Sequence, residues 1–245
     1  MTSTSRPDQH RPIVLVPGYW LGAWAWDEVV ELLNTAGSRA VGLTLPGLDP
    51  GDTQRTTRTL DDQADAISAI LDEMGGDAVL VGHSGANGPV SLVVDRHPEL
   101  VHRIVWVDSG PMSDGGAFAP DLPEETAELP LPDFDTLGKQ ASLEGLSNEH
   151  LDRFRARAVP EPAQVARARV ALSNSARHDV LTTLICCSIP SVQVLELAAA
   201  GNPMFSAVAH LTNFTAMDLP TGHWPMWSRP QELAEAIREA ATSTS

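Results

Sequence analysis

The stretch Val79-Leu80-Val81-Gly82-His83-Ser84-Gly85-Ala86 decides how the rest of the chain is interpreted. Its first residues are apolar and partly β-branched, which is typical of a buried strand, and the residues after Ala86 have a helical pattern. Small residues flank the central serine, so the chain can turn tightly from strand to helix without a clash. Such a turn lifts a serine hydroxyl above the end of a sheet. We therefore interpret Ser84 as a candidate nucleophile.

The same stretch resembles the nucleophile elbow of the α/β-hydrolase superfamily, with Ala86 where glycine is commoner. The similarity extends over nearly the whole chain outside a central insertion. It implies an α/β-hydrolase fold: a mostly parallel sheet of about six strands, flanked by helices, with an inserted helical cap. It also implies that the backbone N–H of Gly85 faces the developing oxyanion, because Gly85 follows the nucleophile at a helix N-terminus. The side chain of His83 is expected to point away from the site.

Short apolar runs alternate with helical segments along the chain, which predicts a parallel α/β sheet. Strands are expected at residues 13–16, 40–45, 78–82, 104–107, 192–197 and 213–217, and helices at 24–36, 60–74, 86–97 and 231–241. Residues 111–132 are rich in proline, glycine and acid, and residues 134 to about 184 look helical. The predicted division is a hydrolase core at 1–110 and 189–245 and a helical cap at 111–188.

The general base is predicted to be His223, in Leu219-Pro220-Thr221-Gly222-His223-Trp224-Pro225, between the last strand and the last helix. The superfamily places its base there, in the chain order serine, acid, histidine. Two carboxylates compete for the acid. Asp108 ends the fourth predicted strand, where haloalkane dehalogenases carry theirs, and Glu196 lies in the predicted penultimate strand, the commoner location. We favour Asp108, because no aspartate ends that penultimate strand.

The segment that follows the first strand reads Val16-Pro17-Gly18-Tyr19-Trp20-Leu21-Gly22-Ala23-Trp24-Ala25-Trp26. It resembles the His-Gly-x-x-x-Gly-x-Trp-x-Trp start of plant methyl esterases and hydroxynitrile lyases, with Pro17 in place of the histidine. That match implies that the Tyr19 backbone N–H is the second oxyanion donor and that Gly18 allows close approach of the substrate. Trp20, Trp224 and Trp227 are candidate substrate-binding residues, since their rings could stack on a flat apolar substrate.

Composition narrows the classes of partner. The 245 residues carry a formal net charge of −16, which argues against nucleic acid and anionic membrane surfaces. No apolar run approaches the roughly 18 residues that span a bilayer. The polar start, Met1 to Pro12, is expected to be a disordered leader. The adjacent cysteines Cys186 and Cys187 are expected in the core of a reduced, cytoplasmic protein, either a monomer or a homodimer.

The predicted function is a serine hydrolase that cleaves a small, aromatic carboxylester or a methyl carbamate through an acyl-enzyme. No metal-ligand cluster, dinucleotide fingerprint or phosphate loop is present in the sequence, so no metal or cofactor is expected, and the partner is a small-molecule substrate. In size and pattern the chain is similar to the carbendazim-hydrolysing esterases.

Alternatives on the same fold are a cofactor-free dioxygenase, a lyase and a ligand-sensing receptor. The lyases need a lysine or an equivalent group near the triad, and the only lysine here, Lys139, falls in the cap. A receptor has no need of an intact nucleophile.

Overall fold

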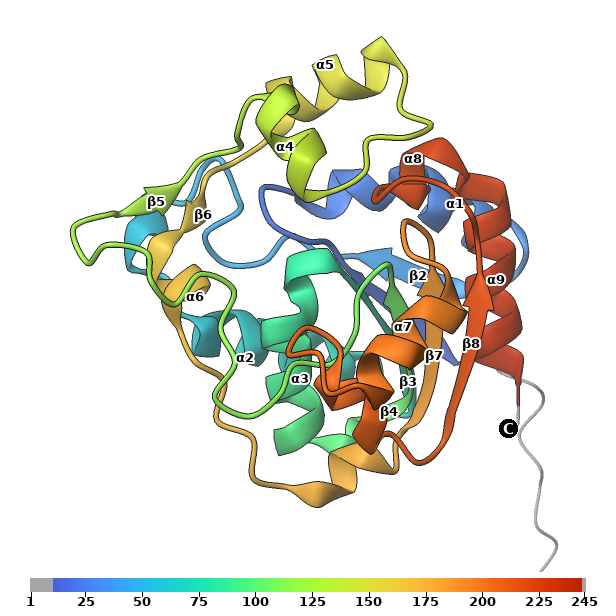
Figure 1. Ribbon diagram of the computed structural model, residues 1–245. Helices are drawn as coiled ribbons and strands as arrows, with labels where there is room; N and C mark the ends of the chain where they lie inside the picture. Colours follow the sequence, from blue (N-terminus) through green and yellow to red (C-terminus); the bar gives the residue numbers. More distant parts are fainter. Residues whose placement is uncertain (1–10, 244–245) are drawn as a thin grey trace, which may run out of the picture.

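A computed structural model describes residues 11–243, and a six-stranded sheet runs through its centre (Figure 1). The strand order is β2-β1-β3-β4-β7-β8, and all neighbouring strands are parallel. The strands are β1 (Pro12–Val16), β2 (Arg39–Gly42), β3 (Ala78–His83), β4 (Val101–Val107), β7 (Leu181–Cys186) and β8 (Phe214–Asp218). The leader expected at Met1 to Pro12 lies outside the described residues up to residue 10, and Pro12 already belongs to β1.

Helices cover both faces of the sheet, as expected for a doubly covered parallel sheet (Figure 1). One face packs against α1 (Asp27–Thr35) and α9 (Pro230–Thr242), and the other against α2 (Leu60–Glu73), α3 (Asn87–Arg96) and α7 (Ser191–Ala199). Alternate residues of β3 point to opposite faces of the sheet. Val79 and Val81 pack on the side of α1 and α9, and Leu80 packs on the side of α2, α3 and α7. The predicted α/β-hydrolase fold is thereby confirmed.

Local signals in the sequence place the helices. A capping box starts α2: the Thr59 hydroxyl accepts a hydrogen bond from the Asp62 N–H (3.1 Å), and the Asp62 carboxylate accepts one from the Thr59 N–H (2.8 Å). Gly37, at φ 89°, follows the end of α1 in the left-handed conformation that favours glycine. These ends fix where the chain returns to the sheet.

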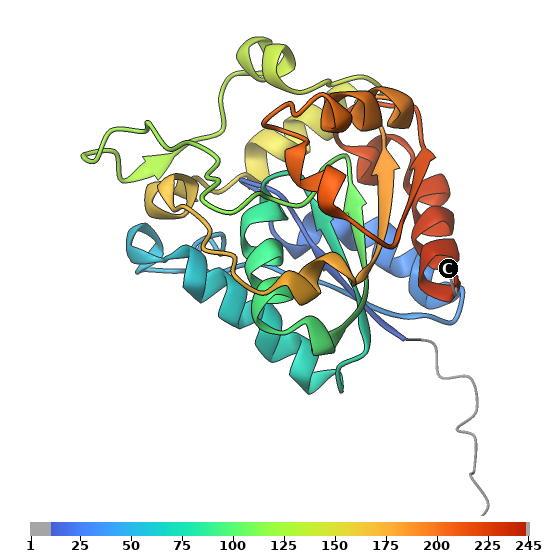
Figure 2. The ribbon, with the colours of Figure 1, turned by 60° about the horizontal axis from the view of Figure 1, so that its bottom comes forward.

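The segment between β4 and β7 forms the cap, which extends along the top and the left of Figure 1 and returns to the sheet from the bottom; Figure 2 shows the same segment turned by 60°. It contains the helices α4 (Phe134–Gln140), α5 (Asn148–Arg157) and α6 (Ala163–Arg167) and an antiparallel pair, β5 (Glu128–Leu129) with β6 (Glu161–Pro162). The cap is therefore a mixture of helices, loops and one small strand pair, and not the mainly helical unit that the sequence suggested.

The predicted end of the cap at residue 188 is wrong, and so is the predicted strand at 192–197. Residues 181–186 form β7, a strand of the central sheet, so the core resumes there. Residues 192–197 belong to α7, whose buried Val194 and Ala198 stand four residues apart. The alternation of valine and leucine at 192–197 resembles a strand pattern. The true strand lacks alternation because it is buried on both faces between β4 and β8.

Two composition-based expectations concern residues that the structure describes. Both cysteines are free and buried, as predicted for core residues. Within residues 11–243, no helix has the length and apolar character needed to cross a membrane.

Candidate active site

Ser84 stands at the turn between β3 and α3, with a left-handed φ of 52°. A non-glycine residue in this region is strained, and the surroundings hold it: the Ser109 hydroxyl donates a hydrogen bond to the Ser84 carbonyl (2.9 Å). The small neighbours are required by close packing. A Cβ atom at Gly82 would lie 3.0 Å from the Trp106 ring, and one at Gly85 would lie 2.6 Å from the Tyr19 ring. The strand–turn–helix predicted for this stretch is present.

The structure brings Ser84, His223 and Asp108 into one hydrogen-bonded chain. The Ser84 Oγ lies 2.8 Å from the His223 Nε2, and the His223 Nδ1 lies 2.6 Å from the Asp108 Oδ2. The three residues follow the carboxyl ends of β3, β8 and β4, which meet at one edge of the sheet. With Nδ1–H donated to the carboxylate, Nε2 is left to accept the serine proton. This arrangement can turn a serine hydroxyl into a nucleophile.

Asp108 is held as a buried, ionised acceptor. Its Oδ1 accepts hydrogen bonds from the backbone N–H groups of Cys187 (3.0 Å) and Ser188 (2.8 Å), and its Oδ2 accepts one from the Ser188 hydroxyl (2.6 Å). Burial alone would raise the pKa of this carboxyl, but the bonds from His223 and Ser188 outweigh burial and lower the pKa to about 2. Asp108 itself has a φ of 43°, a second strained position at this edge.

Glu196, the other candidate acid, does not reach the site. It is exposed on α7, whereas Asp108 contacts His223 directly. The loop after β7, where the superfamily commonly carries its acid, here supplies the donors Cys187 and Ser188 to Asp108. Asp218, at the end of β8, is engaged elsewhere, because its carboxylate accepts from the N–H and hydroxyl of Ser191 at the start of α7.

His83 is a neighbour that the sequence did not reveal. The expectation that its side chain points away from the site is wrong: the His83 Nε2 lies 2.8 Å from the His223 carbonyl oxygen. Because a carbonyl only accepts, Nε2 carries the proton. Burial, followed by the nearby His223, lowers the pKa of His83 to about 3, so the ring is neutral. On the other side, the Ser142 carbonyl of the cap accepts from the His223 N–H (2.7 Å).

The loop after β1 lies directly against the elbow. A Cβ atom at Gly18 would lie 2.7 Å from the Ser84 Cβ, and the Tyr19 ring packs on Gly85. The Tyr19 N–H has no acceptor among residues 11–243. Trp20 follows in the left-handed conformation, with φ 67°. This turn, residues 18–20, is called the oxyanion turn below, after the role that the sequence match predicts for Tyr19.

The three tryptophans predicted to bind substrate are packing residues instead. Trp20, Trp224 and Trp227 are each less than 9% exposed. The Trp20 indole donates to the Leu129 carbonyl (2.9 Å), the Trp227 indole donates to the Ala25 carbonyl (3.1 Å), and Trp224 packs edge-on against His223. They were misassigned because a tryptophan beside a catalytic segment can support the loop as well as line a pocket.

Phe118 of the cap is an aromatic side chain that the sequence did not single out. It is 49% exposed, and its ring centroid lies 4.3 Å from that of Tyr19. It therefore presents apolar surface above the oxyanion turn. No motif marks it, because its loop has no regular secondary structure.

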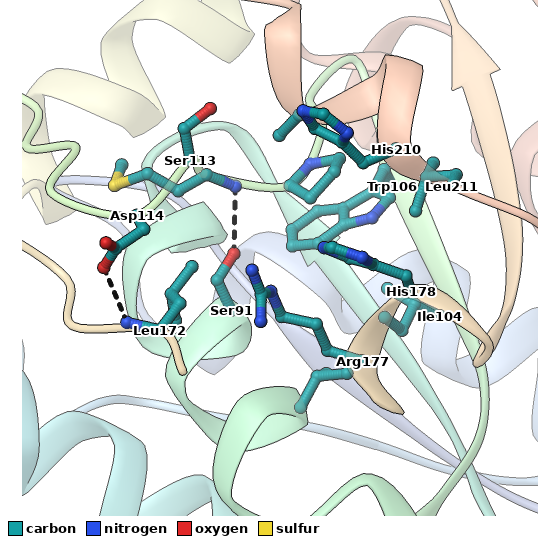
Figure 3. A pocket seen from close by; sticks show the side chains of 14 residues that line it. Ser91, Ile104, Trp106, Ser113, Asp114, Leu172, Arg177, His178, His210 and Leu211 are labelled. Carbon is teal, nitrogen blue, oxygen red and sulfur yellow. Dashed lines mark hydrogen bonds between the residues drawn. The ribbon is translucent and has the colours of Figure 1, made fainter. Parts of the chain in front are cut away.

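A cavity of about 220 Å³ lies beside α3, apart from the triad (Figure 3). None of Ser84, His223 and Asp108 lines it. Two of its polar side chains are hydrogen-bonded to backbone groups of the lining: the Ser91 hydroxyl accepts from the Met112 N–H (3.0 Å), and the Asp114 carboxylate accepts from the Leu172 N–H (2.8 Å). The reaction site is therefore at the elbow and not in this cavity. Among the described residues, no group of three or more metal-ligating side chains is placed to hold a metal ion.

The close packing of Gly18 against the elbow gives a testable consequence. Gly18→Ala should lower kcat about 10²-fold, because its methyl group displaces Ser84 from His223 by a fraction of an ångström or more. Steady-state kinetics on a chromogenic ester would measure the loss. Gly138→Ala, in the cap helix α4 and 3.3 Å from only a flexible leucine, is the matched control. Equal activities of the two variants would contradict the prediction.

Comparison with known proteins gives the family. Residues 13–236 match the sequence profile of the alpha/beta hydrolase family. The chain belongs to this family. One relative is the putative chloroplastic methylesterase 14 of Arabidopsis thaliana, which is 31% identical over an alignment that covers 43% of this chain and 31% of that protein. Another is polyneuridine aldehyde esterase of Rauvolfia serpentina, which is 29% identical over an alignment that covers 44% of this chain and 42% of that protein. The alignments thus span less than half the length of these two relatives.

Two further relatives match over nearly their whole length. The pyrethroid hydrolase of Sphingobium wenxiniae is 23% identical over 94% of this chain and 87% of its own. The solved structure of an extracellular alpha/beta-hydrolase from a Paenibacillus species superposes with a TM-score of 0.76 at 20% identity, covering 95% of this chain and all of that one. The chain is therefore similar to the branch of the family that contains methylesterases and a pyrethroid hydrolase, and the structural match supports the fold.

Proposed function

We propose that the protein is an esterase in which Ser84 is the nucleophile, His223 the general base and Asp108 the orienting acid. The hydrogen-bonded chain from Ser84 through His223 to Asp108 carries this proposal. The Ser84 Oγ attacks the substrate carbonyl carbon while its proton passes to the His223 Nε2. The imidazolium then gives that proton to the leaving alcohol, and an acyl-serine remains. A water molecule, deprotonated by His223, releases the acid and restores Ser84.

The oxyanion of each tetrahedral intermediate would be stabilised by the backbone N–H groups of Tyr19 and Gly85. The unoccupied N–H of Tyr19 and the packing of the Tyr19 ring on Gly85 support this assignment. Gly18 leaves room for the substrate carbonyl beside Ser84.

The substrate class we infer is a small, neutral carboxylester, with methyl and aryl esters as the first candidates. The relatives include a putative methylesterase, polyneuridine aldehyde esterase and a pyrethroid hydrolase. The net charge of −16 disfavours anionic substrates. With the three tryptophans buried, the case for an aromatic substrate rests on Phe118, whose exposed ring lies against the buried Tyr19.

A methyl carbamate of the carbendazim type is a narrower form of the same proposal. Nitrogen donation makes a carbamate carbonyl less electrophilic than an ester carbonyl, so both oxyanion donors would be needed. The lyase alternative finds no support, since Lys139 is exposed on α4. A dioxygenase or a receptor would not need the hydrogen bond between the Ser84 hydroxyl and the His223 Nε2.

A substrate panel tests the proposal. It contains p-nitrophenyl esters of increasing chain length, a methyl arylcarboxylate and a methyl benzimidazolylcarbamate, each compared by kcat/KM. We expect the short and aryl esters to be the best substrates. If a long-chain aliphatic ester has the highest kcat/KM, the small-substrate assignment is wrong. If no ester is hydrolysed and a serine-directed phosphonate leaves Ser84 unlabelled, the esterase assignment itself is wrong.

A further inference from the structure

The cap is hydrogen-bonded to the oxyanion turn at Trp20. The Trp20 carbonyl accepts a hydrogen bond from the Val159 N–H (3.0 Å), and the Trp20 indole N–H donates to the Leu129 carbonyl (2.9 Å). Leu129 of β5 pairs directly with Glu161 of β6. The β5–β6 pair and the segment just before β6 are therefore hydrogen-bonded to the residue that follows the proposed oxyanion donor, Tyr19.

Glu161 lies at the centre of this connection and is fully buried. Its Oε1 accepts a hydrogen bond from the Gln63 side chain (3.1 Å), which also donates to the Pro46 carbonyl (3.2 Å). Its Oε2 has no hydrogen-bond partner in the described part of the chain. A buried carboxylate without a cationic partner is costly, whereas a neutral carboxylic acid is not.

No cationic side chain among residues 11–243 forms an ion pair with Glu161, and none contributes to the shift of its pKa. Gln63 of α2 and the Trp20 backbone N–H favour the ionised form, but burial outweighs them and raises the pKa of Glu161 to about 8. The titratable neighbour is Tyr19, whose pKa is raised first by burial and then by the charge of Glu161. On β5, Glu128 forms an ion pair with Arg55 at 2.5 Å, so this arginine is paired with Glu128 and not with Glu161.

We propose that Glu161 is a positioning residue for the reaction, and that its neutral form holds the oxyanion turn in the geometry that lets the Tyr19 N–H meet the oxyanion. This inference rests on the proposed esterase function. Ionisation places an unpaired charge beside Trp20 and Tyr19. The β5–β6 pair then moves to hydrate that charge, and the turn moves with it.

Activity is measured as kcat and KM on p-nitrophenyl acetate from pH 6 to 9.5. In the wild type, kcat falls as Glu161 ionises near pH 8, while KM changes little. In Glu161→Gln, whose amide cannot ionise, this alkaline fall is absent. Glu161→Ala loses about tenfold in kcat at every pH, because the bond to Gln63 that fixes the β5–β6 pair beneath Trp20 is lost, and glutamine restores most of that loss. Glu128→Gln, the same change on the neighbouring strand, keeps the wild-type alkaline fall.

Thermal unfolding tests the same residue without turnover. The unfolded chain releases the Glu161 proton near its ordinary pKa of 4.5, and the folded chain near 8, so this residue makes the fold less stable as pH rises between those values. The Tm of Glu161→Gln minus that of the wild type should therefore increase from pH 5 to pH 8. A constant difference, or an alkaline fall in kcat that persists in Glu161→Gln, would overturn the proposal. Absence of turnover with an increasing Tm difference would instead implicate the esterase assignment.

Discussion

Ser84→Ala reduces kcat/KM by about 10³-fold or more on the best ester of the panel, because the variant has no oxygen with which to form an acyl-enzyme. The fold should be unaffected. The Ser84 side chain makes its hydrogen bond only to His223, and the turn is held through the Ser84 carbonyl by Ser109. Loss of turnover with an unchanged circular dichroism spectrum is the expected result.

Ser109→Ala is the matched control for this experiment. It removes the hydroxyl that bonds the Ser84 carbonyl (2.9 Å) but leaves the Ser84 hydroxyl itself in place, so it should weaken turnover far less than Ser84→Ala. A serine-directed phosphonate should modify the peptide that carries Ser84 in the wild type, but not in Ser84→Ala, when digests are analysed by mass spectrometry. Near-normal activity of Ser84→Ala would exclude the nucleophile assignment.

The second large effect is expected at Asp108. Asp108→Asn should lower kcat about 10³- to 10⁴-fold, because an amide beside the His223 Nδ1 favours the tautomer whose Nε2 carries the proton and cannot accept one from Ser84. The bonds that Cys187 and Ser188 donate hold the carboxyl group in place. His223, followed by Ser188, outweighs burial and lowers the pKa of Asp108 to about 2, so the wild-type group is ionised across the neutral range.

Glu196→Gln is the control for Asp108→Asn, since it makes the same chemical change at the competing carboxylate. Glu196 is exposed on α7, and its replacement should leave kcat unchanged. If Glu196→Gln lowered kcat more than Asp108→Asn, the assignment of Asp108 as the acid would be wrong. Thermal melts of both variants would separate a loss of catalysis from a loss of fold.

The sequence predicted the parts of the site that depend on short-range patterns. Ser84 and Gly85 were recognisable because a nucleophile elbow needs small residues at fixed spacing. His223 was recognisable from its place between the last strand and the last helix. Asp108 was harder, because the usual position after the penultimate strand is vacant, and a mistaken strand at 192–197 made Glu196 a competitor.

What the sequence could not provide depends on contacts between distant segments. The role of His83 beneath the His223 carbonyl joins residues 140 positions apart. The burial of Trp20 follows from its contact with Leu129 across 109 positions. No local periodicity encodes such pairs, so tryptophans that pack loops resemble pocket walls in the sequence. The strand β7 was missed for a related reason: two threonines made a fully buried strand look like the end of a polar helix.

The attachment of the cap to both functional loops has a consequence for protein engineering. Val159 and Leu129 are hydrogen-bonded to Trp20 of the oxyanion turn, and the Ser142 carbonyl accepts a hydrogen bond from the His223 N–H. Exchanging the cap with that of a relative, a common route to new specificity, would therefore transplant part of the catalytic alignment along with the substrate contacts. Chimeras that keep residues 128–129, 142–144 and 159–162 from this chain should retain turnover more often than chimeras cut at the cap boundaries. The cap is thus less interchangeable than its place as an insertion suggests.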